Sequence, residues 1–187
     1  MLPLLNLEEI EAWLLNVPAL VKRFEERDPD FVPAVKSWLA GVEDTLSKNR
    51  LPQTAEIAVC RGALISVERG YSDDAAPQCR MGARNFREAR AAHLLKRATE
   101  LITETIHVRR GQVDEAGRIL MQIVAVADHL GLIPTDSGQS HTANLQAFLL
   151  AISNRPELAS LVVHVTGLLG KADTLMMLDR SIARIRH

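Results

Sequence analysis

The stretch that most constrains the fold is residues 78–110, which contain no proline and consist mainly of strong helix formers. The apolar residues recur at the spacing of a helix, about 100° per residue, so we predict one long helix over this range. From Ala91 onward, one side of this helix is apolar and is expected to face the core. The residues on that side are Ala91, Leu94, Leu95, Ala98, Leu101, Ile102 and Ile106.

The first turns of the same helix carry arginines where the later turns carry apolar residues, and their own apolar residues lie roughly opposite. The helix is therefore predicted to change its buried side before Ala91. An unpartnered guanidinium is not expected in a core, because its removal from water is costly. We expect these arginines to form an anion-binding or partner-binding surface whose partners are carboxylates. The candidate site residues are Arg80, Arg84, Arg87 and Arg90.

The rest of the chain also shows helical spacing, and alternation with a period of two persists nowhere, so no strand is predicted. We predict an all-α fold, a compact bundle of about seven helices. In this bundle the long helix, about 78–110, ends at Gly111 and packs against a second helix at 113–130. Ile123 is expected to be fully buried in that second helix, whose middle is apolar nearly all round.

Length and composition predict a single helical domain over residues 1–187. Within it, residues 1–50 form an N-terminal helical subdomain held by an aromatic cluster, residues 51–133 form the central helices, and residues 141–187 form a C-terminal three-helix segment. The best linker candidate is the polar stretch 134–140. The aromatic cluster is expected to comprise Trp13, Phe24, Phe31 and Trp38.

The overall charge and the chain's apolar segments exclude several classes of protein. The net charge is -1, so the chain as a whole has no polyanion-binding character, and nucleic acid is disfavoured as a partner. No apolar run is long enough to cross a membrane, and the N-terminal segment lacks the basic residues of a signal peptide. We therefore expect a cytoplasmic protein with no membrane partner. Cys60 and Cys79 lie among apolar neighbours and are predicted to be buried free thiols.

One polar stripe on the long helix invites a metal-site interpretation. Glu104 and His107 form half of the paired motif that ferritin-like bundles use to hold two metal ions. A second copy of this motif does not occur in the chain, and the stripe lies opposite the apolar side. We therefore predict a solvated face, with no metal, no cofactor and no catalytic residue. The stripe comprises His93, Arg97, Glu100, Glu104 and His107.

Two short segments resemble known families. Residues 109–134 resemble the second helix of a tetratricopeptide repeat, with Gly111 and Asp114 in the familiar order, which implies protein binding. The likeness covers half of one repeat, and no 34-residue period recurs. The spacing of Arg87 and His93 is similar to that of HEPN-type ribonucleases and covers these two residues alone.

The leading functional expectation is a non-enzymatic helical protein-interaction module, an adaptor or regulatory subunit. Its partner would be another protein or a second copy of the chain in a homodimer. The alternative is a protein that binds a small ligand, an anion or nucleic acid through the arginines. A third interpretation is a helical enzyme whose active site has no detectable motif.

Overall fold

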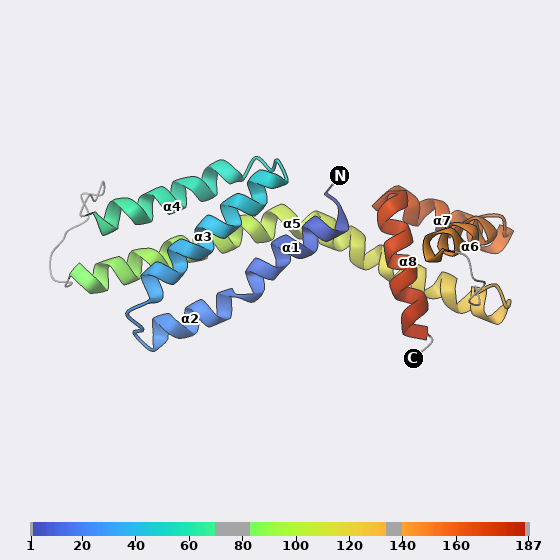
Figure 1. The fold of residues 1–187 in the computed structure, drawn as a ribbon, viewed down its shortest axis with the longest axis horizontal. Helices are drawn as coiled ribbons and strands as arrows, with labels where there is room; N and C mark the ends of the chain where they lie inside the picture. The colour runs from blue at the N-terminus through green and yellow to red at the C-terminus, as the bar shows by residue number, and fades with distance from the viewer. Residues whose placement is uncertain (1, 70–82, 134–139, 186–187) are drawn as a thin grey trace. The chain divides into compact units, whose positions relative to one another are not determined.

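The structure is a computed structural model that describes residues 2–69, 83–133 and 140–185 (Figure 1). These residues form eight α-helices and no strand, so the all-α class is confirmed. The chain divides into two compact units, Met1–His107 and Val108–His187, called here the N-terminal and C-terminal units. The single domain over residues 1–187 and its subdivisions stay predictions. Most of the predicted linker, residues 134–139, and Cys79 lie outside the described residues.

The N-terminal unit contains four helices and the first part of a fifth, α5. Asn16 separates the first two helices, and Pro18 stands in the first turn of the second, where a missing N–H group breaks no helical hydrogen bond. The helices are α1 (Leu4–Leu15), α2 (Val17–Glu25), α3 (Phe31–Lys48), α4 (Thr54–Glu68) and α5 (Ala83–His129).

Apolar packing and two ion pairs join α3 to α4. In one ion pair, Arg61 Nε donates to Glu43 Oε2 at 2.6 Å, and Nη2 of the same guanidinium donates to Oε1 at 3.3 Å. In the other, Lys36 Nζ lies 2.6 Å from Glu68 Oε2. The apolar core beneath these pairs is buried and includes Val35, Leu39, Val42 and Leu46 of α3 and Ile57, Cys60 and Leu64 of α4.

The four aromatic residues of the predicted N-terminal cluster make two sets of contacts. The rings of Phe24 and Phe31 lie 5.2 Å apart, centroid to centroid. Trp13 Nε1 donates to the Thr45 hydroxyl at 3.0 Å, and Trp38 Nε1 donates to the Trp13 carbonyl at 2.9 Å. The Trp13 ring lies so close to α3 that a Cβ atom at Gly41 would approach it to 2.2 Å, so only glycine fits there.

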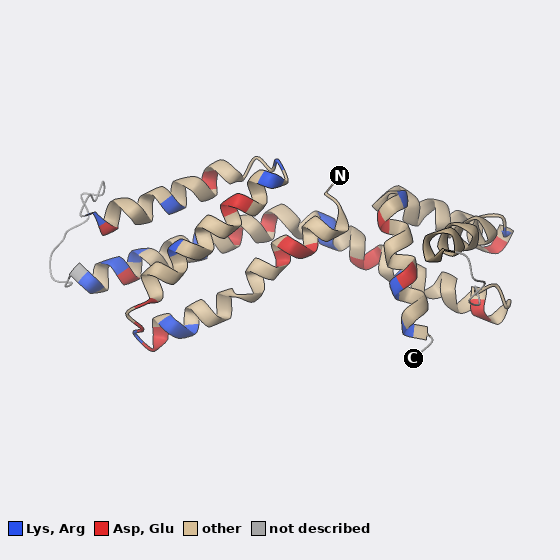
Figure 2. Ribbon diagram, viewed as in Figure 1, with Lys and Arg blue, Asp and Glu red and all other residues tan. Residues whose placement is uncertain are grey.

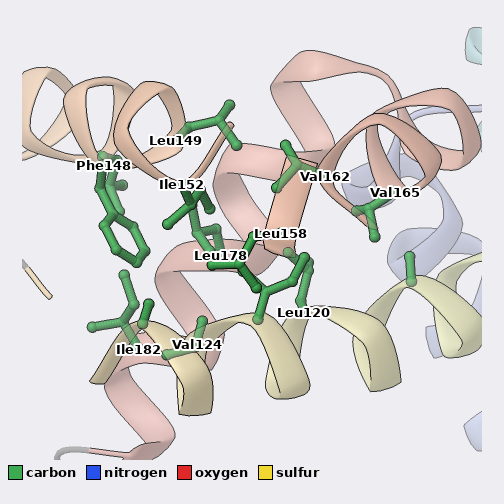
Figure 3. Close-up of a cluster of buried hydrophobic side chains, with 14 of the residues drawn as sticks. Leu120, Val124, Phe148, Leu149, Ile152, Leu158, Val162, Val165, Leu178 and Ile182 are labelled. Atoms are coloured by element: carbon green, nitrogen blue, oxygen red, sulfur yellow. The ribbon is translucent and has the colours of Figure 1, made fainter. Parts of the chain in front are cut away.

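The C-terminal unit surrounds the second part of α5 with three further helices, α6 (His141–Ser153), α7 (Pro156–Leu169) and α8 (Lys171–Ile185). Figure 3 shows their apolar side chains converging on α5. Ile123 is 0% exposed, as predicted. Its neighbours in this core include Leu120, Val124, Phe148, Ile152, Leu158, Val165 and Leu178.

The long helix is confirmed, but it does not stop at Gly111. α5 runs from Ala83 to His129 without a break, so the helix predicted at 113–130 is its continuation and does not pack against it. Glycine weakens a helix without ending it, and the next proline is Pro134. Buried residues on both sides of Gly111, Ile106 and Ala116, hold the segment in the helix. The stop that does occur is Gly131, whose φ of 64° is left-handed.

The continuity of α5 predicts an unusual result for one substitution. Gly111 is exposed, and no atom lies within 4 Å of a Cβ added there. Gly111→Ala should therefore stabilise the protein by about 0.5–1 kcal/mol, because alanine loses less entropy in a helix. Gly131→Ala should instead destabilise it by about 1 kcal/mol, because an L-residue is strained at positive φ. Urea unfolding of both variants checks this; destabilisation by Gly111→Ala would contradict a continuous helix.

Candidate functional site

The predicted arginine surface lies at the N-terminal end of α5. Arg84 and Arg87 are exposed, Arg90 is half-buried, and Arg80 lies outside the described residues. Between residues 84 and 90 no residue is buried, and the first buried residue of the helix is Ala91. The predicted change of buried side therefore does not occur in these residues. Arg84 and Arg87 remain solvated because no residue of α5 from 84 to 90 is buried.

Arg84 joins α5 to the turn between α2 and α3. Its Nε donates to Glu88 Oε1 at 2.7 Å, an i,i+4 pair within the helix, and its Nη2 donates to the carbonyl oxygen of Arg27 at 2.9 Å. Arg27 itself has a left-handed backbone with a φ of 54°. The guanidinium thus has a carboxylate partner from its own helix and also fixes the position of a loop carbonyl.

A hollow of about 430 Å³ lies beside these arginines. Its polar wall contains Arg84 and Arg87. Its apolar wall comes from the turn before α3 and from the first turn of α3 itself. Charges of both signs face this space, since carboxylates from α4 and α5 also line it. The lining residues are Pro29, Val32, Pro33, Glu68, Arg84, Arg87 and Glu88.

A second hollow, the apolar groove, lies between α2, the start of α3 and α5. It measures about 340 Å³ and is almost entirely apolar. Val21 and Phe24 remain 43% and 39% exposed on its α2 side. The residues that line it are Val17, Val21, Phe24, Phe31, Ala92, Leu95, Lys96, Thr99 and Glu100.

The polar stripe from His93 to His107 is solvent-exposed along its length, as predicted. The nearby ion pair joins Lys96 and Glu100 at 3.8 Å, and both side chains are more than half exposed. Within residues 2–69, 83–133 and 140–185, no three His, Cys, Asp or Glu side chains are grouped so as to hold a metal ion.

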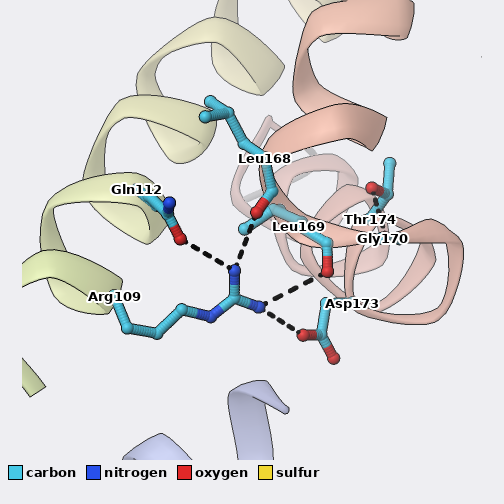
Figure 4. Close-up of polar contacts among 7 residues, drawn as sticks. All are labelled: Arg109, Gln112, Leu168, Leu169, Gly170, Asp173 and Thr174. Carbon is cyan, nitrogen blue, oxygen red and sulfur yellow. Dashed lines mark hydrogen bonds and ion pairs between the residues drawn. The ribbon is translucent and has the colours of Figure 1, made fainter. Parts of the chain in front are cut away.

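The most deeply buried charges form an ion pair in the C-terminal unit that sequence reasoning missed (Figure 4). Arg109 Nη2 lies 2.8 Å from Asp173 Oδ2, and the side chains are only 7% and 11% exposed. The same guanidinium donates to the carbonyl oxygens of Leu168 and Leu169 at 2.8 and 3.4 Å. These carbonyls belong to the last turn of α7, where a helix leaves its acceptors unpaired.

The buried ion pair has a structural role. Arg109 supplies donors to the end of α7, while Asp173 balances its charge from the first turn of α8. Gly170 lies between the two helices with a φ of 82°, which allows the sharp turn. The one signal in the sequence is that Arg109 falls on the apolar line of α5, between Ile106 and Val113.

Cys60 is buried and free, as predicted. Burial raises the pKa of its thiol above the ordinary value, with a smaller opposing effect of Arg97. A raised pKa lowers the thiolate fraction at neutral pH, and the thiolate is the reactive form. The chemistry of this residue is therefore that of an inert core side chain.

In Figure 2, acidic and basic segments are interspersed along the helices. None of the described helices is long and apolar enough to cross a membrane alone. By length and composition only, α7 and α8 together could form a span, bent by 117° between them.

The chain matches no protein-family model, and no curated protein or solved structure is significantly similar to it.

The buried ion pair predicts a large loss of stability when one partner is removed. Arg109→Ala should cost about 3–5 kcal/mol, because Asp173 and the α7 carbonyls lose a buried partner. Arg118→Ala, an exposed change on the same helix, should stay within about 0.5 kcal/mol. Denaturant melts measure both. If Arg109→Ala behaved like Arg118→Ala, the pair would have no structural role.

The burial of Cys60 predicts slow modification. In a Cys79→Ser variant, which leaves one thiol, Ellman's reagent at pH 8 should react at least about 10-fold more slowly with the native protein than with the urea-unfolded chain. The native rate should rise with pH, because the raised pKa leaves little thiolate at neutral pH. Equal native and unfolded rates would show that the thiol is accessible.

Proposed function

We propose that the protein is a non-enzymatic helical interaction module that binds an amphipathic helix of a protein partner in the apolar groove. The observation that carries the proposal is the exposure of large apolar side chains along this groove, Val21 and Phe24 above all. Apolar clefts with polar rims are a recurring mode by which one protein receives a helix of another. The cytoplasmic location stays a prediction.

The spacing of the lining residues suits a helix. On α2, Val17, Val21 and Phe24 stand at i, i+4 and i+7, so the apolar edge extends about 10 Å along that helix at 1.5 Å per residue. On α5, the lining residues run from Ala92 to Glu100, an edge of about 12 Å at the same rise. Two edges of about two helical turns each are long enough for the i, i+3/i+4, i+7 anchors of one amphipathic helix.

The groove is open to solvent along one side, which suits a helix. A helix needs only one covered face. Lys96 and Glu100 also line the groove and supply it with charges of both signs, joined in an exposed ion pair at 3.8 Å.

The proposal predicts that amphipathic peptides bind and that one substitution weakens their binding. A displayed library of about 20-residue helical peptides should yield binders with apolar anchors at i, i+3/i+4 and i+7. Val21→Glu should weaken these binders at least about 10-fold, because it places a charge in the apolar contact. Fluorescence anisotropy measures the affinities.

The matched control is Val59→Glu on α4, which is 64% exposed and lies outside the groove. It should change the affinity less than about 2-fold, and circular dichroism should show both variants folded. A library without binders, or binders indifferent to Val21→Glu, would refute the proposal. A dimer that dissociates on Val21→Glu would assign the groove to a second copy, and saturable binding of a small apolar dye there would assign it to a ligand.

A further inference from the structure

The hollow beside the N-terminal end of α5 has an uneven balance of charge. Glu68 is held by Lys36 at 2.6 Å, and Glu88 is held by Arg84 at 2.7 Å. Arg87 also lines the hollow, is exposed, and makes no ion pair or hydrogen bond with the residues that the structure describes. The lining residues carry two acids and two bases, and Lys36 pairs with Glu68 without lining the hollow, so Arg87 is left as the guanidinium that no lining carboxylate balances.

The walls of the hollow differ in chemistry. Pro29, Val32 and Pro33 supply an apolar wall from the start of α3 and the turn before it. Arg87 stands on the α5 side, where its planar fork can hold a carboxylate with two parallel hydrogen bonds. A volume of about 430 Å³ lies in the range of small-ligand sites, about 300–1,000 Å³.

The two glutamates limit the charge of an acceptable ligand. Glu68 and Glu88 line the same hollow as Arg87 and already occupy Lys36 and Arg84, so Arg87 is the cation left to balance the charge of a ligand. A phosphate carries close to two negative charges at neutral pH and meets both carboxylates. A carboxylate carries one, which Arg87 alone can balance.

We propose that this hollow binds a carboxylate carried on a small apolar group, with the carboxylate on Arg87 and the apolar group against Val32 and Pro33. The carboxylate is either that of a free organic acid or the C-terminus of a peptide. The inference does not rest on the proposed helix-binding function, because the hollow and the apolar groove share no lining residue.

A titration of the full chain with benzoate tests the proposal. The readout is the NMR signals of the arginine side-chain Nε–Hε groups. Benzoate should produce a saturable shift with a dissociation constant below about 10 mM. Arg87→Gln should weaken binding at least about 10-fold, whereas Arg97→Gln, an exposed change further along α5, should leave it within about 2-fold. Benzamide, the neutral analogue, and inorganic phosphate should each bind at least about 10-fold more weakly than benzoate.

The arms of the experiment separate the two sources of the carboxylate. The third ligand is a short peptide that ends in a free Phe carboxylate, with its C-terminal amide as the control. If the peptide binds more tightly than benzoate, the carboxylate is that of a peptide C-terminus. If benzoate binds more tightly, the carboxylate is that of a free acid. The proposal would be overturned if benzoate did not saturate the site, if Arg87→Gln left the affinity for benzoate unchanged, or if benzamide bound as tightly as benzoate. Phosphate binding as tight as benzoate would overturn the assignment to a carboxylate.

Discussion

One unbroken helix supplies apolar side chains to both hydrophobic cores, and the rest of the structure depends on that continuity. The buried positions of α5 keep the helical spacing from Ala91 to Ala127, past the exposed Gly111. Arg109 occupies one of these positions, so a charge interrupts the apolar line near the place where the two units divide. Its bonds to the end of α7 make that charge compatible with burial.

The same helix explains where the solvated arginines lie. Apolar residues are buried from Ala91 onward, and the turns before it project side chains into solvent. Arg84 consequently reaches the α2–α3 turn, and Arg87 lines a hollow whose opposite wall belongs to α3. Burial and charge thus divide α5 into a segment that packs and a segment whose charged side chains remain exposed.

The helical class, the buried face after Ala91 and the burial of Ile123 could be predicted because each depends on local spacing. Local spacing could not show whether the helix continues through Gly111. It does continue, because packing on both sides outweighs the weak helix propensity of glycine. The partner of Arg109 lies 64 residues away, and no local pattern indicates it. The two hollows depend on how the α2–α3 turn and α5 meet, which is a property of tertiary structure. Arg84 and Arg87 could be singled out because charge on a predicted apolar line is visible in the sequence, and their role as a binding site stays a prediction.

The sharing of α5 has a consequence for how such a chain can be divided or recombined. A fragment ending at residue 133 would keep Leu120 and Val124 but lose α6, α7 and α8, which cover them. A cut near residue 107 would leave unpaired amides on one side and unpaired carbonyls on the other. Neither half is therefore expected to fold when it is separated from the other. An exchange of one half for another sequence would have to keep the chain helical across the join, so the two halves are expected to be inherited together.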